Sequence, residues 1–313
     1  KRMFSSKHTL LLVFLLGYSN SSDPDDSLPV YMRGINWNKV QEYLKEDLRL
    51  SDSVVPINYA LDLSVNVRGH AGAKHSDFNG TATIYLNVIK PIDEIELHSN
   101  GLTIEKAGLV NSLIMSTPAG VSSISSNFER ETITIHANRT IQPYEEFMLQ
   151  ITYHGVARMD ENGLYENWDP KYNKSADSNG PFILASKNFP AGARFWFPCF
   201  DEPGKRATFE LQVNHPQELN AYSNTDIQRT ESPIIGRILT VFNKTQLMST
   251  YQVALSVNHL QSHNLEVEGF QKVRLINSEN THNHLPSILD IYAKSINADA
   301  KYFFPFFLFF LSF

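Results

Sequence analysis

Two adjacent carboxylates and one thiol are the first groups in this sequence that could do chemistry. Asp201 and Glu202 have the side chains that general acid–base catalysis uses, but prolines on either side place the pair in a turn. A structural role is therefore favoured, with Arg194 as the cation that satisfies one of the carboxylates. Cys199 is the single cysteine, which excludes an internal disulfide and favours burial as a small apolar group.

The histidines offer two candidate metal-binding pairs. His259 and His263 have the spacing of the two imidazoles in a His-Glu-x-x-His zinc helix, but Leu260 stands where the general base belongs. His282 and His284 would lie on one side of an extended segment. Neither pair has an identifiable third ligand, so we expect solvated loop histidines and assign no metal-binding residue.

Composition indicates a folded domain without a basic surface. The 313 residues are 42% hydrophobic, enough for a sizeable core, and the formal net charge is −6. A nucleic-acid-binding domain needs a basic stripe, and the sequence has none, so we expect no nucleic-acid partner.

The first 19 residues have the features of a secretory signal peptide. Lys7 precedes an apolar run at residues 10–16, and small polar residues follow, with cleavage expected after Ser19. The run is too short to span a membrane as written, and a signal anchor is the alternative. Asn-x-Ser/Thr triplets agree with this route and predict an extracellular or plasma-membrane location. The candidate N-glycosylation residues are Asn79, Asn138, Asn173 and Asn243.

Residues 50–262 show the alternation of apolar and polar side chains that is typical of strands buried on one face. The longer alternating sets lie at residues 59–67, 82–88, 147–153, 207–213 and 251–257, and shorter ones at 92–97, 133–135 and 238–242. Many short strands without long helices between them predict a mainly β domain, built as an antiparallel sandwich.

The flanking segments have a different character. Residues 20–49 are predicted to form a polar linker with a short helix, because apolar residues recur there at spacings of three and four. Residues 263–300 change towards an amphipathic helix that begins near Pro286. Residues 301–313 are too aromatic for a soluble surface and too short to span a bilayer. We interpret this tail as a gene-model artefact, with a lipid-anchor signal as the alternative.

Residues 193–209 strongly resemble the Ala-Arg-x-x-Phe-Pro-Cys-Phe-Asp-Glu-Pro-x-x-Lys-Ala-x-Phe signature of the aminopeptidase N family of zinc metallopeptidases. The signature residues are Ala193, Arg194, Pro198, Cys199, Phe200, Asp201, Glu202 and Pro203. Further blocks that are similar to the family follow the same order at residues 55–61, 78–80, 95–104, 151–165 and 248–254. The resemblance implies the family's saddle-like N-terminal β domain at residues 50–262 and a truncated start of the catalytic domain at 263–300.

The resemblance also implies where a substrate would be held. In the family, a Thr-Gln-x-Glu-Pro-like segment before the Ala-Arg helps to bind the free amine of the peptide; residues 186–190 here are Ser-Lys-Asn-Phe-Pro. Phe189 stands in place of the amine-binding glutamate, and Lys187 in place of a neutral glutamine. A benzyl ring cannot accept a charge-assisted hydrogen bond from an ammonium group, and Lys187 would repel it.

Two functions follow from the resemblance. The chain is either the N-terminal part of a zinc aminopeptidase that removes N-terminal residues from peptides, or a secreted non-catalytic homologue that binds a protein or matrix partner. The family's His-Glu-x-x-His and Gly-x-Met-x-Asn segments are absent from these 313 residues. We therefore expect no catalytic residue, no bound zinc and no peptide hydrolysis in the chain as written. An unrelated β-sandwich adhesion or carbohydrate-binding module would leave the ordered matches unexplained.

Overall fold

The computed structural model describes residues 49–68, 73, 75–111, 120–143, 145–168, 182–267, 270–277 and 294. The chain divides into two compact units, residues 1–49 and 50–313, and nearly all described residues belong to the second. The predicted signal peptide, linker helix and aromatic tail lie outside the described residues, as do Asn173 and, apart from Lys294, the helix predicted near residue 286. In the described part, no helix has the length and apolar character needed to cross a membrane.

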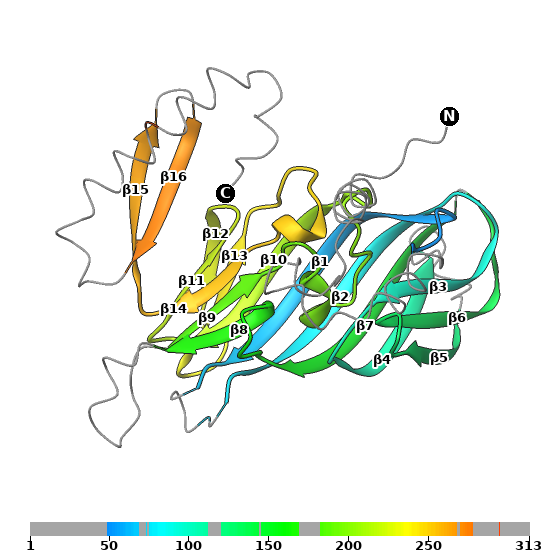
Figure 1. Cartoon of the computed structure of the whole chain (residues 1–313), viewed down its shortest axis with the longest axis horizontal. Coiled ribbons are helices and arrows are strands. Elements are labelled where there is room, and N and C mark those ends of the chain that lie inside the picture. The colour runs from blue at the N-terminus through cyan, green and yellow to red at the C-terminus, as the bar shows by residue number, and fades with distance from the viewer. Residues whose placement is uncertain are drawn as a thin grey trace, which may run out of the picture. The chain divides into compact units, whose positions relative to one another are not determined.

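The largest sheet contains strands from most of the domain. Its members are β1 (Val54–Asn66), β2 (Asp77–Val88), β4 (Thr103–Asn111), β7 (Glu146–Val156), β10 (Thr208–Pro216), β12 (Ile227–Glu231) and β13 (Arg237–Phe242). They form a seven-stranded sheet in the order β12-β13-β10-β1-β2-β7-β4 (Figure 1).

Three smaller sheets accompany it. The other strands are β3 (Ile92–His98), β5 (Val121–Asn127), β6 (Thr132–Ile141), β8 (Gly163–Trp168), β9 (Phe182–Lys187), β11 (Asn220–Ser223), β14 (Leu255–Asn258), β15 (Gln261–Val267) and β16 (Phe270–Asn277). Their orders are β11-β14-β9-β8, β3-β6-β5 and β15-β16. Short 3₁₀ helices lie at η3 (Ala193–Phe195) and η4 (Thr250–Gln252). Residues 263–267 and 270–277, within the segment predicted to start a catalytic domain, are therefore strand.

The mainly β prediction is confirmed, because the alternating residues are buried as strands. In β1, Tyr59, Leu61 and Leu63 are buried while Asp62 between them is exposed. The same pattern runs through β2, β7 and β10. Period-two burial places one face of each strand in the core and leaves the other in solvent.

Two details differ from the sequence-based expectation. β1 and β10 pair in parallel, from Asn58 opposite Thr208 to Ser64 opposite Asn214, so the large sheet is mixed. A parallel pair needs a long crossover, and strands β2 to β9 lie between these two in sequence. The strand predicted to begin at Tyr251 is wrong there, because residues 250–252 form η4 and β14 begins only at Leu255.

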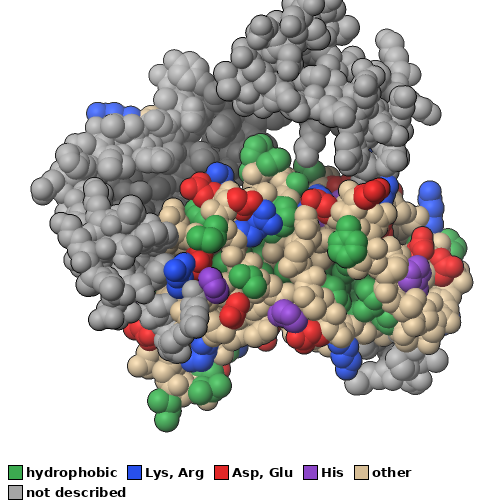
Figure 2. Space-filling view, turned by 60° about the horizontal axis from the view of Figure 1, so that its bottom comes forward, with side chains coloured by type: hydrophobic (Ala, Val, Ile, Leu, Met, Phe, Trp, Pro, Cys, Tyr) green, Lys and Arg blue, Asp and Glu red, His purple; other side chains and the backbone are tan. Residues whose placement is uncertain are grey.

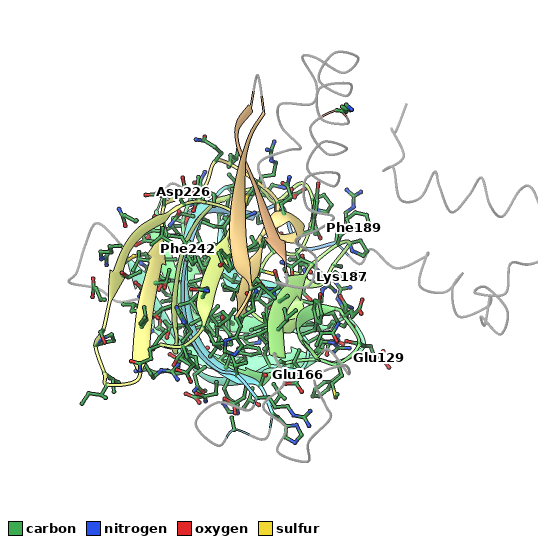
Figure 3. The ribbon with its side chains drawn as sticks, turned by 90° about the vertical axis from the view of Figure 1, so that its left-hand side faces the viewer. Glu129, Glu166, Lys187, Phe189, Asp226 and Phe242 are labelled. Atoms are coloured by element: carbon green, nitrogen blue, oxygen red, sulfur yellow. The ribbon has the colours of Figure 1, made fainter. Side chains whose placement is uncertain are left out.

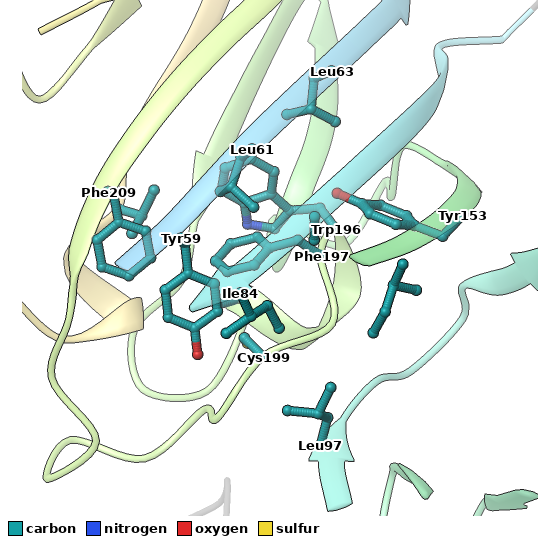
Figure 4. Packing of buried hydrophobic residues seen from close by; sticks show 14 of the residues in the cluster. Tyr59, Leu61, Leu63, Ile84, Leu97, Tyr153, Trp196, Phe197, Cys199 and Phe209 are labelled. Carbon is teal, nitrogen blue, oxygen red and sulfur yellow. The ribbon is translucent and has the colours of Figure 1, made fainter. Parts of the chain in front are cut away.

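The core lies where the signature segment packs against the large sheet. Figure 4 shows Trp196, Phe197 and Cys199 among side chains of β1, β2, β3, β7 and β10. The ring of Tyr59 stacks on that of Phe209 at 4.8 Å between centroids, and Phe197 meets Tyr59 edge-on at 6.0 Å. Each large apolar side chain buried in this way contributes about 1.5–3 kcal/mol to folding.

Candidate functional site

Asp201 is the most enclosed carboxylate of the signature. Its Oδ2 lies 3.0 Å from Nε of Arg194, and its Oδ1 accepts a 2.7 Å hydrogen bond from the hydroxyl of Thr250. The backbone N–H of Asp201 donates to Nδ1 of His98 at 3.2 Å. The side chain of Asp201 is only 1% exposed. The expectation that Arg194 satisfies one carboxylate is confirmed.

The guanidinium group of Arg194 extends this network to a second carboxylate. Its Nη1 lies 2.9 Å from Oε2 of Glu131, whose Oε1 accepts a 2.6 Å hydrogen bond from Nδ2 of Asn100. Glu131 has a left-handed backbone (φ 55°) in the turn between β5 and β6. The network therefore joins η3, η4 and two turns, which is the arrangement of a structural junction.

Glu202 points to a different part of the domain from Asp201. Its Oε1 accepts a 2.7 Å hydrogen bond from the backbone N–H of Leu50. Lys205, in the same loop, donates from Nζ to the carbonyl of Ser51 at 2.8 Å and to Oδ1 of Asp52 at 2.7 Å. We call Glu202, Lys205 and residues 50–52 the chain clamp. Since the two adjacent carboxylates serve separate partners, they do not form one acid–base site.

Cys199 is buried, as expected, and its backbone is fixed by two hydrogen bonds with His98, of 2.8 and 3.1 Å. Burial raises the pKa of its thiol well above the ordinary value, and the nearby carboxylate of Asp201 acts in the same direction. Burial likewise raises the pKa of Tyr59, whose hydroxyl accepts a 3.1 Å hydrogen bond from the N–H of Phe200. Both groups therefore stay protonated and unreactive at neutral pH.

Lys187 and Phe189 lie at the exposed end of β9, on one side of the domain (Figure 3). Nζ of Lys187 is 3.6 Å from Oε2 of Glu161, and both side chains are more than half exposed. Phe189 is 72% exposed and meets the ring of Tyr251 edge-on at 5.9 Å. Lys187 and Phe189, which the resemblance placed near a substrate, thus lie on the same surface. The carboxylate of Glu161 and the ring of Tyr251 lie beside them.

Asn188, between them, faces inward and fixes this end of β9. Its Nδ2 donates to the carbonyl of Val253 at 2.6 Å, and its Oδ1 accepts a 2.9 Å hydrogen bond from Nε1 of Trp196. Because neighbouring side chains of an extended chain point in opposite directions, a buried Asn188 turns Lys187 and Phe189 outward together. We call Lys187, Phe189, Tyr251 and Glu161 the exposed aromatic surface.

The candidate metal pair at His259 and His263 does not have the geometry of a helical zinc motif. His259 lies in a bend and His263 in β15, where four extended residues span on the order of 13 Å. His282 and His284 lie outside the described residues. Within the described ranges, no three His, Cys, Asp or Glu side chains are grouped so that they could hold a metal ion.

Sequence reasoning missed the partners that complete these contacts. Glu131, Thr250 and His98 contact the signature from distant positions, and Glu161 contacts Lys187 across the β8–β9 pair. No local pattern marks them. On the face seen in Figure 2, acidic, basic and hydrophobic side chains are interspersed, with other side chains and backbone between them.

Comparison with known proteins agrees with this fold. A sequence model described as the Peptidase M1 N-terminal domain matches residues 55–252. The chain is 29% identical over 245 residues to a membrane alanyl aminopeptidase of Manduca sexta, covering 74% of this chain and 24% of that protein. It is 27% identical to an endoplasmic reticulum aminopeptidase 1 of Rattus norvegicus (81% and 26% covered). A glutamyl aminopeptidase of Sus scrofa is also 27% identical (69% and 22% covered).

The chain spans about a quarter of the length of these relatives. The match includes the whole signature and the ordered blocks around it as far as residue 252, so the resemblance to the aminopeptidase N family is confirmed. The chain therefore belongs to the peptidase M1 family, of which it carries the N-terminal domain.

Proposed function

We propose that this chain acts as the N-terminal β domain of a secreted or cell-surface aminopeptidase, and that it does not hydrolyse peptides by itself. The observation that carries the proposal is the occupation of both signature carboxylates. Asp201 is enclosed by Arg194 and Thr250, and Glu202 accepts the N–H of Leu50. Carboxylate oxygens that are engaged by donors of the domain itself are not presented to a peptide substrate.

In a longer protein of this family, the catalytic domain would supply the zinc and the general base. Those groups polarise the scissile carbonyl and activate the attacking water. The β domain would then contribute the exposed aromatic surface to the substrate side. The relatives named as membrane and endoplasmic reticulum aminopeptidases support a secretory or surface location for this chain.

The second candidate is a secreted non-catalytic homologue, and the exposed aromatic surface favours it. A protonated α-amine would meet the ammonium of Lys187 and the apolar ring of Phe189. Losing one charge-assisted hydrogen bond weakens binding by about 1.5–3 kcal/mol. An aromatic surface beside a weak ion pair suits contact with a protein or matrix partner, because aromatic residues are enriched in interfaces.

Activity and metal content test the first proposal. The purified chain is incubated with a panel of aminoacyl-anilides, with and without added zinc, and its zinc content is measured by elemental analysis. We expect neither turnover nor stoichiometric zinc, whereas chelator-sensitive turnover would overturn the proposal. Sequencing the transcript past the codon for Ala300 separates the two candidates, because only the first requires a downstream zinc motif.

A further inference from the structure

The outer face of the seven-stranded sheet carries an asparagine whose amide faces solvent. Asn79 lies in β2, opposite Ser64 of β1 and His154 of β7. Its side chain is exposed, while Phe78 and Gly80 on either side are buried. The side-chain amide has no hydrogen-bond partner among the described residues, and Thr81 completes an Asn-x-Thr triplet.

Asn243 combines a fixed backbone with a free side chain. It follows β13 directly, and its N–H donates to the carbonyl of Asp226 at 3.0 Å. Its own carbonyl accepts a 2.6 Å hydrogen bond from the hydroxyl of Thr225. The side chain is exposed and, in the described structure, makes no hydrogen bond. Thr245 completes the triplet.

Asn138 has the same sequence pattern but a different environment. Its Oδ1 accepts a 2.9 Å hydrogen bond from the N–H of Gly120. A Cβ on Gly120 would lie 2.7 Å from Nδ2 of Asn138, so the amide nitrogen packs closely on that backbone. A sugar on Nδ2 would have to open this contact, which neither Asn79 nor Asn243 requires.

We propose that Asn79 and Asn243 carry N-linked glycans in the folded domain and that Asn138 is modified less. In the transfer, Nδ2 loses a proton and forms a bond to C1 of the first N-acetylglucosamine. The bond from C1 to the pyrophosphate of a lipid-linked oligosaccharide donor breaks, and the lipid pyrophosphate leaves. This inference rests on the proposed secretory location, since the donor and transferase belong to that pathway.

The two glycans would leave the exposed aromatic surface uncovered. Asp226 and Phe242, next to Asn243, lie on the opposite side of the view in Figure 3 from Lys187 and Phe189. Asn79 projects from the outer sheet face, away from the buried face against which the signature packs. In the described ranges, the residues of the exposed aromatic surface belong to no Asn-x-Ser/Thr triplet.

Site-specific occupancy tests the proposal. The full chain is expressed in a glycosylating host twice, once with its own first 19 residues and once with a host secretion leader in their place. Glycans are removed enzymatically in ¹⁸O water, which converts each modified asparagine to a labelled aspartate, and peptides are quantified by mass spectrometry. We expect most molecules to be labelled at Asn79 and Asn243 and fewer at Asn138.

Matched variants assign each glycan. Asn79→Gln and Thr81→Ala should each remove one glycan without shifting the melting temperature of the enzymatically deglycosylated protein, and Asn243→Gln should remove the other. Secreted, folded protein that is unmodified at Asn79 or Asn243 would overturn the proposal, as would equal occupancy at Asn138. If the protein is glycosylated when it carries the host leader but not when it carries its own first 19 residues, the secretory location would be refuted while the two sites would be supported.

Discussion

Asp201 connects more parts of the domain than any other single carboxylate described above. It holds η3 through Arg194 and η4 through Thr250, and its backbone is fixed by His98. Because its side chain is 1% exposed, water cannot replace a lost partner. Removing the charge of Asp201 would leave the largely buried guanidinium of Arg194 with only the partly exposed Glu131 as its counter-ion among the described residues, and losing one member of a buried ion pair costs more than the intact pair contributes.

We therefore expect Asp201→Asn to lower the free energy of unfolding by about 3 kcal/mol. Urea denaturation followed by circular dichroism measures the change. Glu210→Gln is the matched control, because Glu210 pairs with Lys244 at 2.8 Å and both side chains are about half exposed. Such a surface ion pair contributes less than about 1 kcal/mol to the free energy of unfolding. Equal effects of the two variants would show that Asp201 is not structural.

His215 makes stability depend on pH. Its Nδ1 donates to the carbonyl of Pro216 at 2.9 Å, so Nε2 accepts from the hydroxyl of Thr240 at 2.8 Å in the neutral ring. Burial lowers the pKa of His215 below 6.5, and Arg237 adds to this, although the hydrogen bond to the carbonyl opposes it. The folded state thus disfavours the protonated ring.

The sign of the effect follows from proton binding. Below pH 6.5 the unfolded chain binds a proton at His215, whereas the folded chain does not bind it until the pH reaches its lower pKa. The free energy of unfolding therefore falls as the pH decreases from 6.5 towards the folded pKa. Above pH 6.5 the neutral ring of His215 makes its full contribution to the free energy of unfolding. Unfolding midpoints measured between pH 7.5 and about 5 should fall more steeply for the wild type than for His215→Gln. A slope unchanged by the substitution would refute the assignment.

Among the elements, β2 and β7 meet at Gly80, where a tyrosine ring of β7 packs on the backbone of β2. A Cβ there would lie 2.4 Å from Cζ and 2.5 Å from the hydroxyl oxygen of Tyr153, a fully buried ring of β7. The strands pair directly at this position, Gly80 opposite Tyr153. Only a residue without a side chain allows the tyrosine ring to lie over β2.

Gly80→Ala should therefore destabilise the domain by about 1–3 kcal/mol, the usual cost of forcing extra atoms into a packed core. Thermal unfolding gives the comparison. Gly108→Ala is the control, because a Cβ at Gly108, in β4 of the same sheet, would meet nothing within 4 Å. If the two variants have the same melting temperature, the packing of the Tyr153 ring on Gly80 does not require the absence of a side chain there.

The elements that sequence could predict are those with one buried face. Strict alternation predicts β1, β2, β7 and β10. It does not predict β5, because six of the seven residues of that strand are exposed and apolar side chains do not recur in it at every second position. Near residue 250, a local capping box formed by Ser249 and Gln252 outweighs the alternation and produces η4. The parallel β1–β10 pairing has no local signal, because pairing partners distant in sequence leave no period.

The same limit applies to the candidate site. The signature indicated that Arg194 satisfies a carboxylate, and family resemblance placed Lys187 and Phe189 near a substrate. Neither could indicate Glu161 or Tyr251, which contact these residues from separate segments. The spacing of residues in a motif cannot predict contacts between side chains that only tertiary packing brings together.

For the molecule as a whole, the chain clamp holds the first residues of the second unit, residues 50–313. The boundary between the two units falls after Arg49, and Leu50 is buried with its N–H bound to Glu202. We expect Glu202→Gln and Lys205→Met to speed hydrogen exchange at the Leu50 amide by at least about tenfold, the equivalent of 1.4 kcal/mol. Exchange mass spectrometry of the peptides from β2 and β7 should show no change. Uniform acceleration across all peptides would indicate global destabilisation and not release of the clamp.

The position of the chain clamp next to β1 also bears on how the domain withstands mechanical force. β1 is a central strand, flanked by β10 and β2 along most of its length. Tension applied through the preceding chain first meets the carboxylate of Glu202 and the ammonium of Lys205 and then runs along β1. The ladders on both sides of that strand would be sheared together and would not unzip one bond at a time, so the domain should resist pulling from this end.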